Sequence, residues 1–188
     1  MLSDRFTNAI KLAAQLHSSQ LRKGTNIPYI SHLLGVTSLV LEHGGNEDEA
    51  IAAMLHDAVE DQGGWETLAL IESQFGANVA AIVRGCTDSY ETPKPAWRIR
   101  KENYLKHLAE ADSSVHLVSN ADKLHNARAI LNDLRICRES VWQRFNGGRE
   151  GTIWYYKSLA NTFQELNGGA LANELNRVVS EIERISRI

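Results

Sequence analysis

The sequence predicts an all-α protein that folds as one domain and is not a coiled coil. Apolar residues recur at steps of three and four along nearly the whole chain, as in amphipathic helices. Glycines and prolines separate these segments, and no stretch of useful length alternates apolar and polar residues. Only Ser114–Val118, rich in β-branched residues, leaves strand and helix open. The 188 residues suit one domain with a core that needs no disulfides.

The sequence marks where most of the expected helices begin or end. Asn46 is a typical N-cap, with acidic residues in the turn that follows, where the helix dipole favours carboxylates. Gly44 and Gly76 stand at expected helix ends. Arg22–Pro28 and residues 88–96 are expected to be loops because they contain glycine or proline. The helices are expected along Phe6, Ile10, Ala13, Ala14 and His17, over Tyr29–His43, from Asn46 to a stop before Gly63, and over Trp65–Phe75, Ala77–Cys86, Trp97–Ala109, His116–Leu134, Glu150–Asn167 and Gly169–Arg187.

Composition excludes several classes of protein. Hydrophobic residues make up 43% and charged residues 23%, which rules out a disordered or fibrous chain. The net charge is −3, from 20 basic and 23 acidic residues, so nucleic acid is not expected as a partner. No apolar run approaches the roughly 18–20 residues of a membrane helix, and the N-terminus does not resemble a signal peptide. Cys86 and Cys137 are isolated, so a reducing, cytoplasmic setting is expected.

The charges are unevenly distributed along the chain. Residues 46–92 contain ten acidic side chains and one basic one. Residues 128–149 contain five basic side chains and two acidic ones. Solvated helix faces would explain this pattern. An acidic metal site beside basic groups that hold an anionic substrate would explain it equally well, so the charge pattern alone leaves both interpretations open.

The residues best suited to chemistry lie within Met54–Asp61, where one histidine and three carboxylates follow an apolar run. On a continuous helix Glu60 lies four residues after His56 and three after Asp57, so the three side chains are expected on one face. Burying so many ionisable groups is costly unless they are compensated, and a divalent cation compensates them. The alternative is a helix end that faces solvent, with carboxylates that only accept hydrogen bonds.

Two further segments favour the metal site. His32 begins an apolar helix, and Asp122 stands among apolar neighbours, so its carboxylate is expected to be buried and to need a partner. Together with His56 and Asp57 they can complete a site of two imidazoles and two carboxylates. Such a set suits Mn²⁺, Fe²⁺ or Zn²⁺ better than Ca²⁺ or Mg²⁺. Four protein ligands leave open positions on a six-coordinate ion for water and a substrate oxygen.

The order of these residues, His then His-Asp then Asp, resembles the HD-domain metal-dependent phosphohydrolases. The hydrolase domain of RelA/SpoT-type alarmone enzymes is similar in three motifs, which stand in the family order: Arg22-Lys23-Gly24 with Pro28-Tyr29-Ile30-Ser31-His32, His56-Asp57-Ala58-Val59-Glu60-Asp61, and Ala121-Asp122-Lys123-Leu124-His125-Asn126. The short chain resembles the stand-alone small alarmone hydrolases, the Mesh1-like group. The resemblance covers about residues 4–165. It implies a single HD-type helical bundle. We expect one domain over residues 1–188, with a C-terminal helix over residues 169–187 packed on the bundle.

The resemblance also implies a role for each motif residue. The two histidines and two aspartates named above would hold Mn²⁺. Glu60 and Asp61 match the pair that orients and activates the attacking water. Arg22 and Lys23 match a pair that contacts the substrate, and Asn126 matches an asparagine that contacts the nucleoside. A guanidinium can stack on a purine and an ammonium can pair with phosphate, which agrees with these roles.

The implied activity is a Mn²⁺-dependent 3′-pyrophosphohydrolase. Water would attack the 3′-phosphate ester of the guanosine alarmones (p)ppGpp, which releases pyrophosphate and leaves GDP or GTP. Ser119, Asn120 and Ala129 depart from the family pattern on the helix expected to line the base. The adenosine analogues (p)ppApp therefore remain open as substrates, and the expected ligand is a purine nucleotide with a 3′-diphosphate.

Two alternative functions remain. Another HD-type nucleotide phosphohydrolase, such as a 5′-nucleotidase, usually lacks the Glu-Asp pair and the Arg-Lys-Gly…Pro-Tyr-Ile segment that are present here. A non-catalytic nucleotide sensor would be favoured by a missing metal ligand, and none of the four is missing. Neither nucleic acid nor membrane is expected as a partner, and the sequence leaves the oligomeric state open.

Overall fold

The structure is a computed structural model that describes residues 1–89, 93–166 and 168–187, so part of the expected loop 88–96 lies outside the described residues. The described residues contain no strand and one isolated bridge, between Leu21 and Pro28, which confirms the all-α class. None of their helices combines the length and apolar character that crossing a membrane requires. The helices are α1 (Asp4–Leu16), α2 (Ile30–Glu42), α3 (Glu47–Leu55), α4 (Ala58–Asp61), α5 (Gly64–Phe75), α6 (Ala77–Cys86), α7 (Trp97–Glu110), α8 (Ser113–Cys137), the 3-10 helix η1 (Arg138–Arg144), α9 (Gly148–Leu166) and α10 (Ala170–Ser186).

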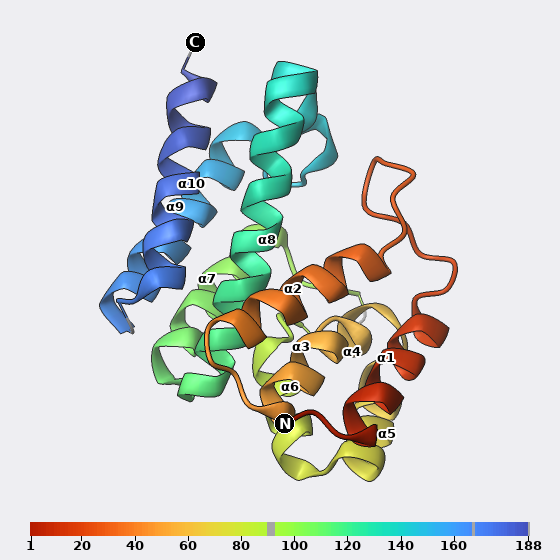
Figure 1. Ribbon diagram of the computed structural model, residues 1–188. Coiled ribbons are helices and arrows are strands. Elements are labelled where there is room, and N and C mark those ends of the chain that lie inside the picture. Colours follow the sequence, from red (N-terminus) through yellow and green to blue (C-terminus); the bar gives the residue numbers. More distant parts are fainter. Residues whose placement is uncertain (90–92, 167, 188) are drawn as a thin grey trace.

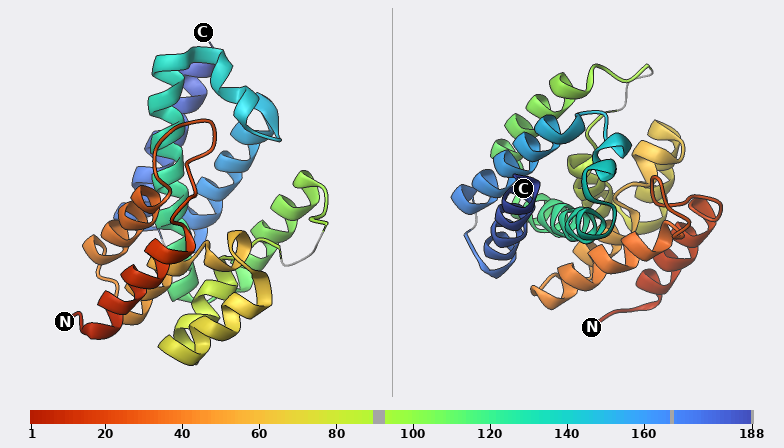
Figure 2. Two further views of the ribbon diagram at one scale, coloured as in Figure 1. Left: turned by 90° about the vertical axis from the view of Figure 1, so that its right-hand side faces the viewer. Right: turned by 90° about the horizontal axis from the view of Figure 1, so that it is seen from above.

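The long helix α8 runs through the middle of the bundle (Figure 1). Helices α9 and α10 lie on one side of it, and the N-terminal helices lie on the other (Figure 2). α8 contacts α2, α3 and α6 as well as α9 and α10, so it joins the two halves of the chain. Fully buried side chains from both halves form one core, among them Leu33, Met54, Leu124 and Phe163.

Local signals account for several helix ends. The Asn46 side chain accepts from the backbone of Glu49, and the Glu49 side chain accepts from the backbone of Asn46, which completes a capping box. Gly76, with φ +93°, separates α5 from α6 in a conformation that favours glycine. Ser114–Val118 is helical within α8. Val115 packs so closely against Gly85 that a Cβ added to Gly85 would lie 2.5 Å from the Val115 side chain. This tertiary packing outweighs the β propensity of the segment.

The main difference from the expected helices lies at the histidine–aspartate motif. The helix expected to carry His56, Asp57 and Glu60 on one face is broken, because α3 ends just before His56 and α4 begins just after Asp57. The expectation of a continuous helix is therefore wrong, although Glu60 still lies close enough to Asp57 for the two charges to interact. Both residues of the break keep right-handed helical dihedral angles, so the chain continues from α3 into α4 without a sharp change in backbone conformation. The apolar spacing hides the break because it continues into Ala58 and Val59, which are both buried.

Candidate metal centre and adjoining cavities

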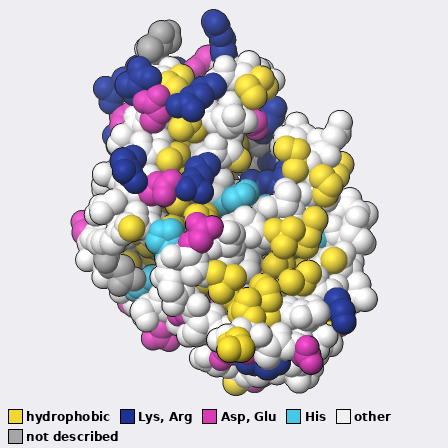
Figure 3. All heavy atoms as spheres, viewed as in Figure 1, with side chains coloured by type: hydrophobic (Ala, Val, Ile, Leu, Met, Phe, Trp, Pro, Cys, Tyr) yellow, Lys and Arg dark blue, Asp and Glu magenta, His cyan; other side chains and the backbone are white. Residues whose placement is uncertain are grey.

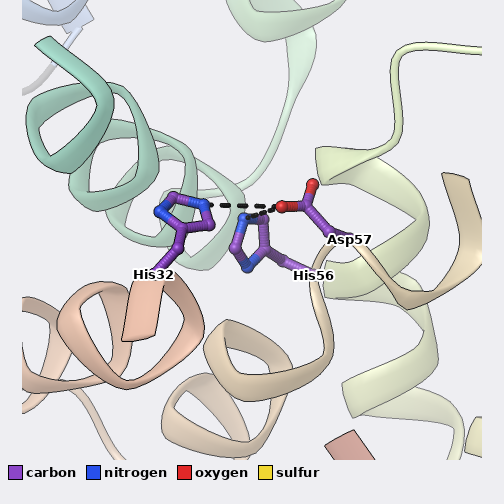
Figure 4. Close-up of side chains that lie close together, drawn as sticks. All are labelled: His32, His56 and Asp57. Carbon is purple, nitrogen blue, oxygen red and sulfur yellow. Dashed lines mark ion pairs between the residues drawn. The ribbon is translucent and has the colours of Figure 1, made fainter. Parts of the chain in front are cut away.

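Two imidazoles and two carboxylates meet between α2, α8 and the break that separates α3 from α4. The Nε2 atoms of His32 and His56 lie 3.4 and 3.0 Å from Oδ2 of Asp57 (Figure 4). The same two nitrogens lie 3.2 and 3.6 Å from Oδ1 of Asp122. Atoms about 2.1 Å from a shared ion lie about 3 Å from their neighbours. The four residues predicted from the sequence are therefore brought together at the spacing of metal ligands.

The ring nitrogens that face this centre are free to bind a metal. Nε2 of His32 and Nε2 of His56 are buried and make no hydrogen bond of normal geometry within the described residues. Nδ1 of His56 lies 2.8 Å from the carbonyl oxygen of Ala53, which can only accept, so Nδ1 carries the proton. When His56 is neutral, its Nε2 atom therefore directs a lone pair toward the carboxylates, as in metal-bound histidines.

The charged groups of the centre shift one another's pKa. Burial lowers the pKa of His56, but Asp57 and Asp122 outweigh it and hold that pKa well above the usual value. Burial raises the pKa of Asp57, but His56 outweighs it and holds the pKa well below normal. Burial raises the pKa of Asp122 in the same way, and Lys123 is the largest of the groups that lower it well below normal. The two ionised carboxylates attract positive charge to the centre. A metal cation that binds there must compete with the protons that bind to the imidazoles.

Neighbouring side chains orient the two carboxylates. The Tyr29 hydroxyl donates to Oδ2 of Asp57 at 2.6 Å, and burial together with Asp57 raises the pKa of Tyr29, so it remains a donor. Nδ2 of Asn126 donates to Oδ1 of Asp122 at 2.5 Å, and Nζ of Lys123 donates to Oδ2 at 2.6 Å. Such contacts hold metal ligands in position. The roles of Tyr29 and Lys123 could not be predicted from the sequence, because only the fold brings these side chains to the carboxylate oxygens.

His125 and Gly35 support His32 from behind. Nδ1 of His125 lies 2.9 Å from Nδ1 of His32. Burial lowers the pKa of His125 to about 4, so this ring is neutral near pH 7. A Cβ on Gly35 would lie 2.3 Å from Nε2 of His125. The glycine therefore leaves the room that the second histidine ring needs.

We expect Gly35→Ala to lower both the melting temperature and the metal affinity. Alanine favours a helix over glycine by about 1 kcal/mol, so helix propensity alone would make the variant more stable. A loss of stability would therefore identify the clash with His125 as the cause. Thermal unfolding and Mn²⁺ titration measure the two effects. Ser38→Ala, an exposed change on the same helix, is the control, and a variant at Gly35 as stable as the parent would contradict the packing argument.

Glu60 and Asp61 lie on α4 beside the four candidate ligands. Nζ of Lys94 donates to Oε1 of Glu60 at 2.7 Å, and Nε2 of Gln20 donates to Oδ2 of Asp61 at 2.8 Å. Burial raises the pKa of both carboxyl groups, and nearby carboxylates, chiefly Asp88 in the case of Glu60, add to the effect. Carboxyl groups with a raised pKa beside a cleft are typical of acid–base chemistry. The contact between Gln20 and Asp61 had no signal in the sequence.

Two cavities adjoin the centre and contain the expected substrate-contacting residues. The larger, of about 510 Å³, is lined by Arg22, Lys23, Asp61 and Asn126 among others. The smaller, of about 260 Å³, also includes Lys23 and Asn126 in its lining. Nη2 of Arg22 donates to Oδ1 of Asn126 at 2.6 Å, which links the loop after α1 to α8.

The smaller cavity is strongly cationic. Lys23, Arg100, Lys101 and Lys123 all line it. Nη1 of Arg100 and Nζ of Lys101 each lie 2.5 Å from an oxygen of Asp88, which holds the two cations side by side. Arginine and lysine side chains gathered in this way suit phosphate groups.

The segment 128–149 contributes less to the site than its charge suggested. Figure 3 shows basic side chains over the upper part of the molecule, where α8 and α10 lie side by side. Arg128 and Arg135 pair with glutamates of α10, as expected of solvated faces. Arg144 lines the larger cavity. Of the three departures from the family pattern, Ala129 lines that cavity too, whereas Ser119 is buried and bonded to the Tyr104 hydroxyl.

A helical bundle that gathers His, His-Asp and Asp from three segments defines the class of HD-domain proteins. Residues 9–153 match the HD domain family, and the chain belongs to that family. Within it the chain falls in the group of MESH1-type hydrolases. It is 39% identical over 137 residues to the guanosine-3′,5′-bis(diphosphate) 3′-pyrophosphohydrolase MESH1 of Xenopus tropicalis, which covers 71% of this chain and 72% of that protein.

Two further comparisons agree. The MESH1 protein of Homo sapiens is 36% identical over 137 residues, again covering 71% of this chain and 72% of the relative. The fold matches the solved structure of a metazoan orthologue of SpoT that is described as hydrolysing ppGpp. That match has a TM-score of 0.78 and 25% identity and covers 95% of both chains. The expected family, the expected fold and the class of hydrolase are thereby confirmed.

Proposed function

We propose that this protein is a Mn²⁺-dependent 3′-pyrophosphohydrolase of the guanosine alarmones (p)ppGpp. The observation that carries the proposal is the meeting of His32, His56, Asp57 and Asp122 directly beside a cationic cavity. The relatives described above are named for this activity. The adenosine analogues (p)ppApp are the alternative substrates that experiment must compare.

The four residues would hold the ion through two nitrogen and two oxygen atoms, a donor set that suits Mn²⁺, Fe²⁺ or Zn²⁺. A divalent cation supplies positive charge for the phosphate oxygens and lowers the pKa of a water molecule. Tyr29 and Asn126 keep the two carboxylates directed at the centre. The low pKa of both carboxyl groups keeps them ionised, so they can bind a cation.

Glu60 and Asp61 are proposed to handle the proton of the attacking water. Each carboxylate lies beside the centre with a raised pKa, which makes it a better proton acceptor than an ordinary carboxylate. Lys94 and Gln20 hold the two groups in place by one hydrogen bond each. The oxygen of the water then forms a bond to the 3′-phosphorus while the bond from that phosphorus to the ribose oxygen breaks, and the ribose oxygen takes up a proton to become the 3′-hydroxyl.

Two cavities suit the two kinds of group in the substrate. The cationic cavity, with Lys23 and Lys123, suits phosphate groups. The larger cavity has apolar and aromatic lining as well as Arg22, and its volume of about 510 Å³ accommodates a nucleoside. Asn126 lines both cavities, so we propose that it contacts the nucleoside where the two meet.

We also propose that residues 1–188 act as one domain in a reducing, cytoplasmic setting. Helix α10 packs on α8 and α9, so the C-terminal helix shares the core with the helices that carry the site. Cys86 and Cys137 are isolated in the sequence, a cysteine usage that supports a reducing compartment.

One assay tests the proposal. The purified protein, stripped of metal and reloaded with Mn²⁺, Zn²⁺ or Mg²⁺, is incubated with ppGpp, ppApp, GTP and 5′-nucleotides. We expect release of pyrophosphate from the 3′-diphosphates with Mn²⁺ and none without metal. Release of orthophosphate from 5′-nucleotides alone would point to a nucleotidase, and binding without turnover would point to a sensor.

Arg22→Ala is expected to raise KM for ppGpp about tenfold and to change kcat less than about threefold. Stacking and ion pairing act on the ground state and the transition state alike, so their loss falls on KM. Steady-state kinetics measure the split. Arg135→Ala, which removes an exposed arginine on α8 outside both cavities, is the control. A fall in kcat with an unchanged KM would contradict the proposed binding role.

A further inference from the structure

One face of α8 continues from the metal centre into the larger cavity. Asp122, Asn126, Ala129 and Asp133 follow one another at steps of four, three and four, so they lie on the same side of the helix. The last three of them line the cavity. At a rise of 1.5 Å per residue, the Cα of Asp133 lies about 16 Å from that of Asp122. Asp133 therefore stands at the far end of the cavity from the candidate metal ligands.

Arg144 fixes Asp133 at that end. Nη1 of Arg144 donates to Oδ2 of Asp133 at 2.6 Å, and both side chains line the cavity. The arginine stem packs on Gly24, where a Cβ would lie 2.8 Å from Cδ of Arg144 and where φ is +71°. A side chain at position 24 would displace the arginine. The pair is thus held between α8 and the loop that carries Arg22 and Lys23.

The pair offers a ligand both acceptors and donors. In the described part of the chain the bond to Arg144 uses Oδ2 of Asp133, so Oδ1 can accept hydrogen bonds from a ligand. Nη2 of Arg144 also lies 3.7 Å from Sγ of Cys137, and the N–H groups that these two contacts leave can donate to a ligand. Ile130, Phe145 and Tyr156 also line this cavity and supply flat or apolar surfaces for a ring.

Guanine matches this arrangement and adenine does not. The Watson–Crick edge of guanine presents two adjacent donors, N1–H and the N2 amino group, and one acceptor, O6. A carboxylate can accept both donors while a guanidinium donates to O6. Adenine presents the acceptor N1 at the position where guanine has a donor, so the carboxylate would face a lone pair, which is unfavourable.

We propose that Asp133 recognises the guanine base by accepting from N1–H and the N2 amino group, with Arg144 donating to O6. The inference rests on the proposed function, which places the 3′-diphosphate at the metal centre and leaves the larger cavity to the nucleoside. It assigns the choice of base to one carboxylate at the end of the cavity, 11 residues along α8 from Asp122.

The test compares the parent with Asp133→Asn in two assays. The first measures kcat/KM for ppGpp and ppApp with Mn²⁺, and the second measures equilibrium binding of GDP, IDP and ADP. We expect the parent to favour guanine at least tenfold in both assays and to bind IDP, which lacks the N2 amino group, more weakly than GDP. An asparagine amide can donate to N1 of adenine and accept from its amino group, so the variant should lose the preference or reverse it.

Glu139→Gln is the matched control, because it removes a carboxylate that pairs with Arg149 outside the cavity. It should keep the parent's preference. If Asp133→Asn keeps the parent's ratio of guanine to adenine while pyrophosphate is released, the inference is wrong and the proposed function stands. Tighter binding of all three nucleotides alike would also overturn it, because Asp133 would then be only a counter-ion for a phosphate-binding Arg144.

Failure of the proposed function would look different. The parent would then release no pyrophosphate from either alarmone. Nucleotide binding still decides the inference in that case: a preference for GDP over ADP that Asp133→Asn removes would support it, and equal binding of the two would overturn it.

Discussion

His56→Ala is expected to weaken Mn²⁺ binding by more than about a hundredfold and to abolish hydrolysis. The imidazole supplies one of two nitrogen donors, and its Nε2 atom lies within 3.6 Å of both carboxylates. Without it, less positive charge compensates the carboxylates of Asp57 and Asp122. Mn²⁺ titration followed by electron paramagnetic resonance measures the loss.

His43→Ala is the control for this variant. His43 caps the end of α2, and its Nδ1 atom contacts only the carbonyl oxygen of Leu39 in the described contacts, so metal binding should be unchanged. If the variant at His56 bound Mn²⁺ as tightly as the parent, the ion would have to lie elsewhere.

Glu60→Gln is expected to lower kcat by roughly 10²–10⁴ while the protein still binds Mn²⁺. Glutamine keeps the shape and an oxygen that can accept from Lys94, but it cannot take up a proton. Because burial raises the pKa of Glu60, the parent should lose activity on the acid side at a pH above the ordinary glutamate value of about 4.3. Activity is then present above the raised pKa and falls as the pH falls through it.

Single-turnover kinetics with metal-loaded protein separate this effect from metal loss. Glu66→Gln, an exposed change in the first turn of α5, should leave kcat unchanged. Full activity of the Glu60 variant would exclude this residue as the proton acceptor and would leave Asp61 as the candidate.

The sequence predicted the helices well because their signals are local. Apolar spacing, the Asn46 cap and the break at Gly76 depend on neighbours in the chain, and the structure has all three. The break around His56 and Asp57 has no such local signal, and Asp57 there accepts a hydrogen bond from Tyr29, 28 residues earlier in the chain. The 3-10 helix after α8 was also missed. It begins at Arg138, whose positive φ of 52° no sequence pattern indicates.

The residues of the candidate site also fall into two groups, those that can be recognised from the sequence and those that cannot. Histidines and a buried aspartate in apolar surroundings are costly without a partner, so His32 and Asp122 could be recognised from the chain alone. Gln20, Lys123 and Asp133 could not. Polar residues of these types are common on helix and loop surfaces, and their roles arise from oxygens and cavities that the fold brings to them.

The most direct test of the account is hydrolysis of ppGpp in water enriched in ¹⁸O. Attack of water on the 3′-phosphorus breaks the bond between that phosphorus and the ribose oxygen. We therefore expect pyrophosphate that contains the label and GDP that contains none, with both products formed only when Mn²⁺ is present. Labelled orthophosphate with a retained 3′-monophosphate, or label in the 3′-hydroxyl of GDP, would contradict the proposed reaction.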